Sequence, residues 1–218
     1  FIGVAYKQAA APLFSSVDVK NMVKHSICLN YSEVTDITPD IRITMYNAGH
    51  ALGSAMIHFN IGNGLHNYIY SGDMKFGKSR LLDSASSHFP RLETLQIEST
   101  YGGKENTSPP RREVEEELIA YVNKVISRKG KLLIPELGLG RSQETMLILE
   151  DAMKNKKIPA VPIYIDGMIW DINAIHTAYP DFLSNSVRSS IFTDNNPFTS
   201  DTFKQVGSSQ ERKNVIEG

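Results

Sequence analysis

The sequence predicts an α/β fold, because a strand-rich first half is followed by a second half in which strands and helices alternate. Residues 41–46 and 55–61 alternate apolar and polar side chains, a pattern that is typical of β-strands. In residues 113–127 the apolar side chains instead recur at the spacing of a helix with one buried face. A hydrophobic content of 41% over 218 residues is sufficient for a sizeable core.

The first half is predicted to contain short strands joined by glycine-rich turns. The run Gly62-Asn63-Gly64 separates the strand at residues 55–61 from the strand-like residues 68–70, which indicates a β-hairpin. Ser16 is the expected N-cap of a helix over residues 17–25. The other elements expected in this half are helical segments at residues 1–13 and 81–87 and a strand at residues 94–97.

The second half is predicted to begin after a polar linker, residues 104–110, which ends in Ser108-Pro109-Pro110. This linker predicts a boundary near Ser108, and hence two partial domains, residues 1–107 and residues 108–218. Acidic residues in its first turn favour the helix at residues 113–127. The elements expected after it are a strand at residues 131–135, a helix at 142–154, a strand at 161–166, a helix at 168–179 and a short helix capped by Ser200.

Composition excludes several classes of protein. Lys and Arg number 23 against 24 Asp and Glu, so the net charge of −1 indicates no global positive field for nucleic acid and leaves room only for a local basic groove. The single cysteine, Cys28, excludes an internal disulfide and a Cys-rich zinc module, and it suits a reducing, cytoplasmic location. No apolar run reaches the ~18 residues of a membrane-spanning helix. The first residue is Phe1 rather than Met, which predicts a piece of a longer chain.

Three side chains suited to metal binding or acid–base chemistry each follow a predicted strand. His50 lies in a glycine-rich turn after residues 41–46, and Asp73 and Glu98 follow two later strand-like runs. Turns at strand ends that carry such side chains beside glycine are typical of metal and general-acid sites. In a turn, either His50 or Asp73 alone would be unremarkable, so the prediction of a metal site depends on the two residues together. We therefore predict that His50 and Asp73 are ligands of a dinuclear metal site, with Glu98 beside them.

Two other glycine-rich segments have features of phosphate-binding loops. Residues 72–79, from Gly72 to Ser79, match the P-loop pattern G-x-x-x-x-G-K-S of NTP-binding proteins. The middle positions of this segment are charged or bulky, and too few residues precede Pro90 for a robust phosphate-binding helix. Gly138 and Gly140 precede a predicted helix at which Arg141 could help to bind a phosphate, or they only turn the chain.

Several motifs together resemble the β-CASP metallo-β-lactamase nucleases. They are GHALGS (residues 49–54), SGD (71–73), ESTYG (98–102) and GRSQE (140–144). The runs DGMIW (166–170) and IHTAYP (175–180) are similar to archaeal homologues of the 73-kilodalton cleavage and polyadenylation specificity factor subunit. The resemblance covers nearly the whole chain. It implies part of a metallo-β-lactamase αββα sandwich followed by part of an inserted β-CASP α/β domain.

The resemblance also implies roles for the residues singled out above. His50 matches a zinc ligand, Asp73 matches the aspartate that bridges two zinc ions, and Glu98 matches the acidic residue that supports a catalytic histidine. The longer parent would hydrolyse RNA phosphodiester bonds, as in mRNA 3′-end processing or RNA decay, with water activated by two zinc ions. The RNA would run between the two domains, with Arg141 as one contact. A homodimer of the parent is a further possibility, and no membrane is involved.

The main zinc-binding motif of the family, H-x-H-x-D-H, is absent from this sequence, in which no two histidines are two residues apart. The resemblance therefore implies an internal fragment, which on its own would bind zinc weakly or not at all and would be inactive. The alternative is a non-catalytic scaffold subunit of RNA processing. The sequence upstream of Phe1 would distinguish the two, because an intact motif means an enzyme.

Overall fold

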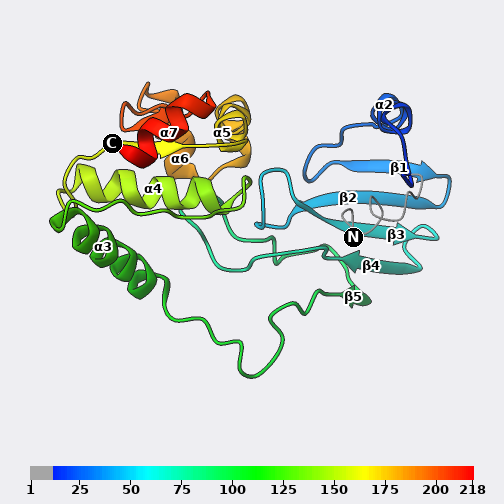
Figure 1. Ribbon diagram of the computed structural model, residues 1–218. Coiled ribbons are helices and arrows are strands. Elements are labelled where there is room, and N and C mark those ends of the chain that lie inside the picture. Colours follow the sequence, from blue (N-terminus) through cyan, green and yellow to red (C-terminus); the bar gives the residue numbers. More distant parts are fainter. Residues whose placement is uncertain (1–11) are drawn as a thin grey trace.

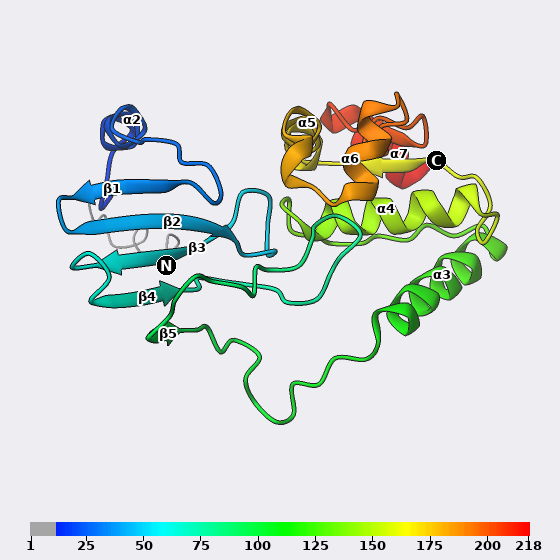
Figure 2. The same ribbon diagram turned by 180° about the vertical axis from the view of Figure 1, so that it is seen from behind.

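The computed structural model describes residues 12–218 of the chain. Residues 34–96 form a β-sheet, here called the sheet part, and residues 111–218 form the helical part. Figure 1 and, from behind, Figure 2 show the two parts side by side, joined by a long irregular segment. The predicted mixed α/β class is confirmed. The helix expected over residues 1–13 lies, apart from its last two positions, outside the described residues.

The sheet part has five strands in the order β1-β2-β3-β4-β5. They are β1 (Val34–Thr38), β2 (Ile41–Asn47), β3 (Ala55–Ile61), β4 (His66–Tyr70) and β5 (Thr94–Gln96). Strands β1 to β4 run antiparallel to their neighbours, whereas β5 runs parallel to β4. The predicted strands at residues 41–46 and 55–61 and the hairpin between β3 and β4 are confirmed. Strand β1 was not expected.

One face of the sheet carries a small core. Its buried side chains are Ala48, Met56, Ile69 and Ala85. Ala85 belongs to residues 81–87, where the expected helical turns do not form. The backbone of this segment bonds to the strand ends instead, because Ala85 N–H donates to the Lys75 carbonyl and Ser86 N–H to the Asn47 carbonyl, both at 2.9 Å. These long-range hydrogen bonds replace the local ones that a helix would make.

The helical part is built around helix α4. Its elements are α3 (Arg111–Ser127), α4 (Arg141–Lys154), β6 (Ile163–Ile165), α5 (Ile169–Ala178), η1 (Pro180–Phe182), α6 (Asn185–Phe192), β7 (Phe203–Gln205) and α7 (Ser209–Glu217). Strands β6 and β7 pair in parallel. The helices predicted at residues 113–127, 142–154 and 168–179 and the strand predicted at 161–166 are confirmed, with ends that differ by up to a few residues. Within residues 12–218 no helix is both long enough and apolar enough to cross a membrane.

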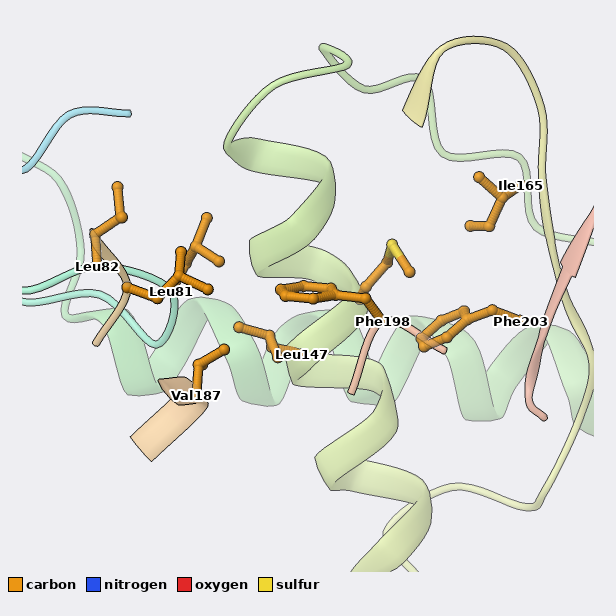
Figure 3. Close-up of a cluster of buried hydrophobic side chains, with 9 residues drawn as sticks. Leu81, Leu82, Leu147, Ile165, Val187, Phe198 and Phe203 are labelled. Carbon is orange, nitrogen blue, oxygen red and sulfur yellow. The ribbon is translucent and has the colours of Figure 1, made fainter. Parts of the chain in front are cut away.

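Two apolar clusters hold α4 in place. The larger contains Leu81, Leu82, Met146, Leu147, Ile165, Leu183, Val187, Phe198 and Phe203. Figure 3 shows these side chains gathered around α4, with Leu81 and Leu82 on one side of the helix and Ile165 and Phe203 on the other. The smaller cluster packs α3 against α4 through Val122, Leu149, Ala152 and Ile158. Burying such side chains contributes roughly 1.5–3 kcal/mol each.

Three further local predictions were wrong. Residues 131–135 do not form a strand, because they have no ladder partner within residues 12–218, and Ile134 packs against the α3–α4 cluster instead. Ser200 does not cap the last helix, since the chain first forms β7 and α7 begins after Ser208, whose hydroxyl accepts from Glu211 N–H at 3.1 Å. Helix α2 (Ser16–Lys24) is capped by Ser15 rather than Ser16.

Residues 80–82 carry the chain of the sheet part into contact with the helical part. Leu81 and Leu82 belong to the cluster around α4, although they lie between β4 and β5 in the sequence. Ser184 secures them, because its N–H donates to the Leu81 carbonyl at 2.8 Å and its hydroxyl to the Arg80 carbonyl at 2.6 Å. Figure 1 shows that the end of the sheet at which β4 stops faces the helical part.

Candidate functional site

His50 and Asp73 lie next to each other at one end of the sheet. The His50 Nε2 atom is 3.9 Å from Asp73 Oδ2, and the two side chains are 51% and 72% exposed. The pairing pattern explains this proximity. Strands β2 and β4 both run antiparallel to β3, so the two turns that follow them leave the same end of the sheet. The predicted proximity of His50 and Asp73 is confirmed, while their role as metal ligands stays a prediction.

The turn that carries His50 is held tightly from both sides. Gly49 has a φ of +65°, and a Cβ atom there would lie 2.6 Å from Ala85 N and 2.7 Å from the Lys75 carbonyl oxygen. Only glycine fits such a close approach in a left-handed conformation. On the other side of His50, the Ser54 hydroxyl accepts the N–H of His50 at 3.2 Å and that of Ala51 at 3.1 Å. The backbone of this turn is therefore fixed while the imidazole stays accessible.

Glu98 follows β5, which leaves the same end of the sheet as β4. Its N–H donates to the hydroxyl of Ser71 at 3.1 Å, and its carboxylate accepts from Thr100 N–H at 2.9 Å and Met74 N–H at 3.4 Å. Hydrogen bonds from Thr100, first from its side chain and then from its backbone, lower the pKa of Glu98, and Met74 and His50 add to this. An ionised Glu98 therefore ties β5 to the turn that carries Asp73.

The donor set of the pair suits zinc, which binds imidazole nitrogen and carboxylate oxygen. Zinc–ligand distances of about 2.0–2.2 Å in a tetrahedron place two donor atoms about 3.4 Å apart. The observed 3.9 Å separation is close to that value, so His50 and Asp73 fit one edge of a zinc site. No group of three or more His, Cys, Asp or Glu side chains is arranged for a metal anywhere in residues 12–218. A zinc ion held by His50 and Asp73 would therefore need further ligands.

Arg141 is the first residue of α4 and is exposed. The preceding Gly140 has a φ of +83°, and a Cβ atom there would lie 4.0 Å from the His50 carbonyl oxygen. The start of α4 therefore lies against the turn that carries His50. The glycine-rich loop before α4 turns the chain, as one of the two interpretations predicted, and it also places Arg141 near His50.

Lys75 is a further positive residue that sequence reasoning missed. Burial lowers its pKa, and the nearby guanidinium groups of Arg111 and Arg141 lower it further. Lys75 follows Asp73 by two residues, and its main-chain N–H donates to the Ala48 carbonyl at 2.9 Å, beside the His50 turn. Its position in the chain was a usable signal, but residues 72–79 drew attention only as a P-loop pattern.

The P-loop interpretation lacks its structural context. No helix follows Ser79, because residues 80–90 are irregular. The Lys78 ammonium, which a P-loop would direct at a phosphate, instead lies 3.4 Å from Asp83 Oδ1. The Ser79 hydroxyl accepts from Leu82 N–H at 2.8 Å. This segment is therefore a folded turn rather than a strand–loop–helix cradle for phosphates.

Comparisons with known proteins agree with the motifs. The Beta-Casp domain model matches residues 142–217. The chain is 50% identical over 218 residues to a protein named transcription termination factor FttA from Methanothermobacter thermautotrophicus, and 50% identical over 218 residues to its namesake from Pyrococcus abyssi. It is 48% identical over 219 residues to the FttA of a Lokiarchaeum species. Each match covers 100% of this chain and 34% of the relative, so the chain spans about a third of the length of these relatives.

Proposed function

Because this chain belongs to the β-CASP family, in which it matches archaeal relatives along its whole length, we propose that it is part of a zinc-dependent ribonuclease. The proposal extends to the longer protein, of which the chain supplies parts of a metallo-β-lactamase domain, residues 1–107, and a β-CASP domain, residues 108–218. The observation that carries it is the 3.9 Å approach of His50 Nε2 to Asp73 Oδ2 at the shared end of β2 and β4.

His50 and Asp73 would hold one side of a two-zinc centre. When bound, zinc lowers the pKa of a bound water to about 7 and so supplies a nucleophile at neutral pH. The residues of this chain then have three tasks. His50 and Asp73 supply donor atoms, and the rigid turn around Gly49 keeps the imidazole in place. Glu98 holds the Asp73 turn through Met74, and Arg141 offsets phosphate charge on the bound RNA.

The relatives bear the name of transcription termination factors, which supports RNA as the substrate. We accordingly place the protein among the enzymes that cut transcripts in 3′-end processing or RNA decay, in the cytoplasm. The full-length protein could act as a homodimer. Residues 12–218 supply too few ligands for a closed metal site, so the 218-residue chain alone would be inactive and would bind zinc weakly.

The proposal is tested on the full-length protein with end-labelled single-stranded RNA and added zinc. His50→Ala and Asp73→Ala should each lower the cleavage rate by more than about 100-fold, since metal ligands are removed. His25→Ala, which removes an exposed histidine at the end of α2, should leave the rate unchanged. Wild-type protein that binds RNA without cutting it would instead support a non-catalytic scaffold and would refute the nuclease.

The zinc content of the 218-residue chain provides a second test. After dialysis, elemental analysis should find well below one zinc per chain, because one imidazole and one carboxylate leave most of a coordination shell empty. Stoichiometric zinc in this chain would contradict the expectation that residues outside it complete the site.

A further inference from the structure

Lys75 and Arg141 come from different parts of the fold and both border the turn that carries His50. Lys75 belongs to the sheet part, and its carbonyl oxygen would lie 2.7 Å from a Cβ atom on Gly49. Arg141 begins α4 in the helical part, and the Cβ position of Gly140 lies 4.0 Å from the His50 carbonyl oxygen. Two cationic residues, one from the sheet part and one from the helical part, thus border the turn that carries His50.

Several carboxylates in this region already have partners. Glu144 accepts hydrogen bonds from the main-chain N–H groups of Arg80 and Leu81, both at 2.8 Å, and pairs with Arg111. Asp83 pairs with Lys78. Asp73 faces His50 at 3.9 Å. In contrast, neither Lys75 nor Arg141 forms an ion pair with any residue in the 12–218 range.

A third cation adds to the local field without being free to bind. Arg111 pairs with Glu115 and Glu144, so its charge is already balanced by two carboxylates. Its contact with Glu144 nonetheless places it at the first turn of α4, so it adds positive charge near the start of that helix. Like charges held together are unfavourable until an anion binds between them. The N-terminus of α4 is not proposed as the anion-binding group, because Gly140 N–H already donates to Gln143 Oε1 at 2.7 Å.

We propose that Lys75 and Arg141 together bind one phosphate group of the RNA backbone, beside the His50–Asp73 pair. The inference rests on the proposed ribonuclease function and names a residue, Lys75, that would hold the substrate for it. Arg141 presents a planar fork of donors to the phosphate oxygens, and Lys75 adds a compact point charge. Because one cation comes from each part of the fold, the phosphate would bridge the sheet part and the helical part next to the reacting bond.

The test measures RNA binding rather than cleavage. Full-length protein carrying His50→Ala, so that the RNA stays intact, is titrated with short fluorescein-labelled single-stranded RNA at several KCl concentrations. Adding Lys75→Ala should weaken binding roughly tenfold, the effect of one charged contact. It should also reduce the slope of log affinity against log salt by up to about 0.7, the value for one phosphate on a single strand, because Arg141 still contacts the same phosphate. Lys75→Arg should restore most of the RNA affinity and most of the salt dependence.

Two comparisons sharpen the test. Lys20→Ala removes an exposed lysine on α2, which Figure 1 shows beyond β1 and away from the helical part, and should change neither quantity. The Lys75→Ala/Arg141→Ala double variant should lose clearly less than the product of the single losses, because both residues bind one phosphate. Ala at position 75 keeps the main-chain hydrogen bonds of Lys75, and equal melting temperatures confirm that the variants are folded.

The outcomes separate the inference from the function on which it rests. If the unmodified protein cleaves RNA but Lys75→Ala binds it like Lys20→Ala, the phosphate site is refuted and the ribonuclease stands. Strictly multiplicative losses in the double variant would refute the shared phosphate, because the two residues would then contact different groups. A protein that neither binds nor cleaves RNA overturns both.

Discussion

The Glu144 carboxylate on α4 accepts the main-chain N–H of Arg80 at 2.8 Å, and its second oxygen accepts that of Leu81 at the same distance. The Arg80 guanidinium in turn contacts Glu115 at 2.7 Å and Asp151 at 3.2 Å. These bonds tie a segment of the sheet part to two helices of the helical part. Since the same helix α4 begins at Arg141, this connection also sets where Arg141 lies relative to His50.

Glu144→Gln should destabilise the chain by about 1–3 kcal/mol, the cost of leaving a buried hydrogen-bond partner unsatisfied. A glutamine amide keeps one acceptor oxygen and replaces the other with a donor, which cannot accept a main-chain N–H. The Glu144 side chain is only 17% exposed, so water does not compensate fully. Urea denaturation monitored by circular dichroism measures the change.

The matched control for this variant is Glu116→Gln on α3. Glu116 also pairs with an arginine, Arg112, but its side chain is 58% exposed. An exposed pair contributes at most about 1 kcal/mol. Equal losses in the two variants would mean that the contact between Glu144 and residues 80 and 81 contributes nothing specific to the junction.

Acid should destabilise the helical part through His176. This imidazole is fully buried, its Nδ1 donates to the Ile172 carbonyl at 2.8 Å, and its Nε2 has no hydrogen-bond partner among the described residues. Burial lowers its pKa below the usual 6.5. As the pH falls below 6.5, His176 therefore binds a proton more readily in the unfolded chain than in the folded chain. The free energy of unfolding consequently falls as the pH falls.

The measurement for His176 is the urea midpoint at pH 7.5 and pH 5.5. Wild-type protein should lose more stability between these values than His176→Leu, which keeps a similar volume and cannot titrate. An equal loss in both proteins would show that other groups cause the acid sensitivity.

Gly49→Ala should be much more harmful than Gly53→Ala, although both residues have positive φ. Both variants incur the left-handed backbone strain of roughly 1–2 kcal/mol. At Gly53 a Cβ atom would meet nothing within 4 Å, whereas at Gly49 it would lie 2.6 Å from Ala85 N. The clash adds about 1–3 kcal/mol. Thermal unfolding of both variants measures the difference, and similar losses would contradict the close packing of the His50 turn.

Pattern and turn chemistry were sufficient to predict much of this fold. Strands β2 and β3 and helices α3 and α4 follow directly from the spacing of apolar residues. The proximity of His50 and Asp73 also follows, because two strands that share an antiparallel neighbour end on the same side. The secondary-structure predictions that were wrong concern segments whose conformation depends on residues distant in the sequence. Residues 81–87 do not form a helix because their main chain forms hydrogen bonds with Asn47 and Lys75 instead. Residues 131–135 have no neighbouring strand in the described part of the chain.

The site was less predictable than the fold. The spacing of residues in the sequence does not reveal that the start of α4 lies against the His50 turn, since residues 50 and 140 belong to different parts of the fold, which contacts of residues 80–82 hold together. Lys75 was therefore overlooked, because its significance comes from Arg141 and Arg111 nearby and not from its sequence neighbours. Charge clusters that form across two parts of a fold leave no local pattern.

Glu93 should make the edge of the sheet sensitive to strong acid. Its carboxylate accepts from the main-chain N–H of Asn67 at 2.6 Å and from the Asn67 side chain at 2.9 Å, and it pairs with Arg91. These contacts, led by the Asn67 side chain, lower the pKa of Glu93 to about 2. The folded-state pKa thus lies below the unfolded value, so this stabilisation is complete above about pH 4.5 and is lost as the pH falls toward 2.

Glu93→Gln should accordingly be less stable than wild type at pH 7. The difference in stability between the two proteins should become smaller as the pH falls from 5 to 2.5. Melting temperatures recorded across that range measure it. Glu105→Gln, an exposed acid in the linker, provides the baseline, because its curve should run parallel to that of wild type. If the Glu93→Gln curve also stays parallel, protonation of Glu93 does not govern how β5 is held against β4.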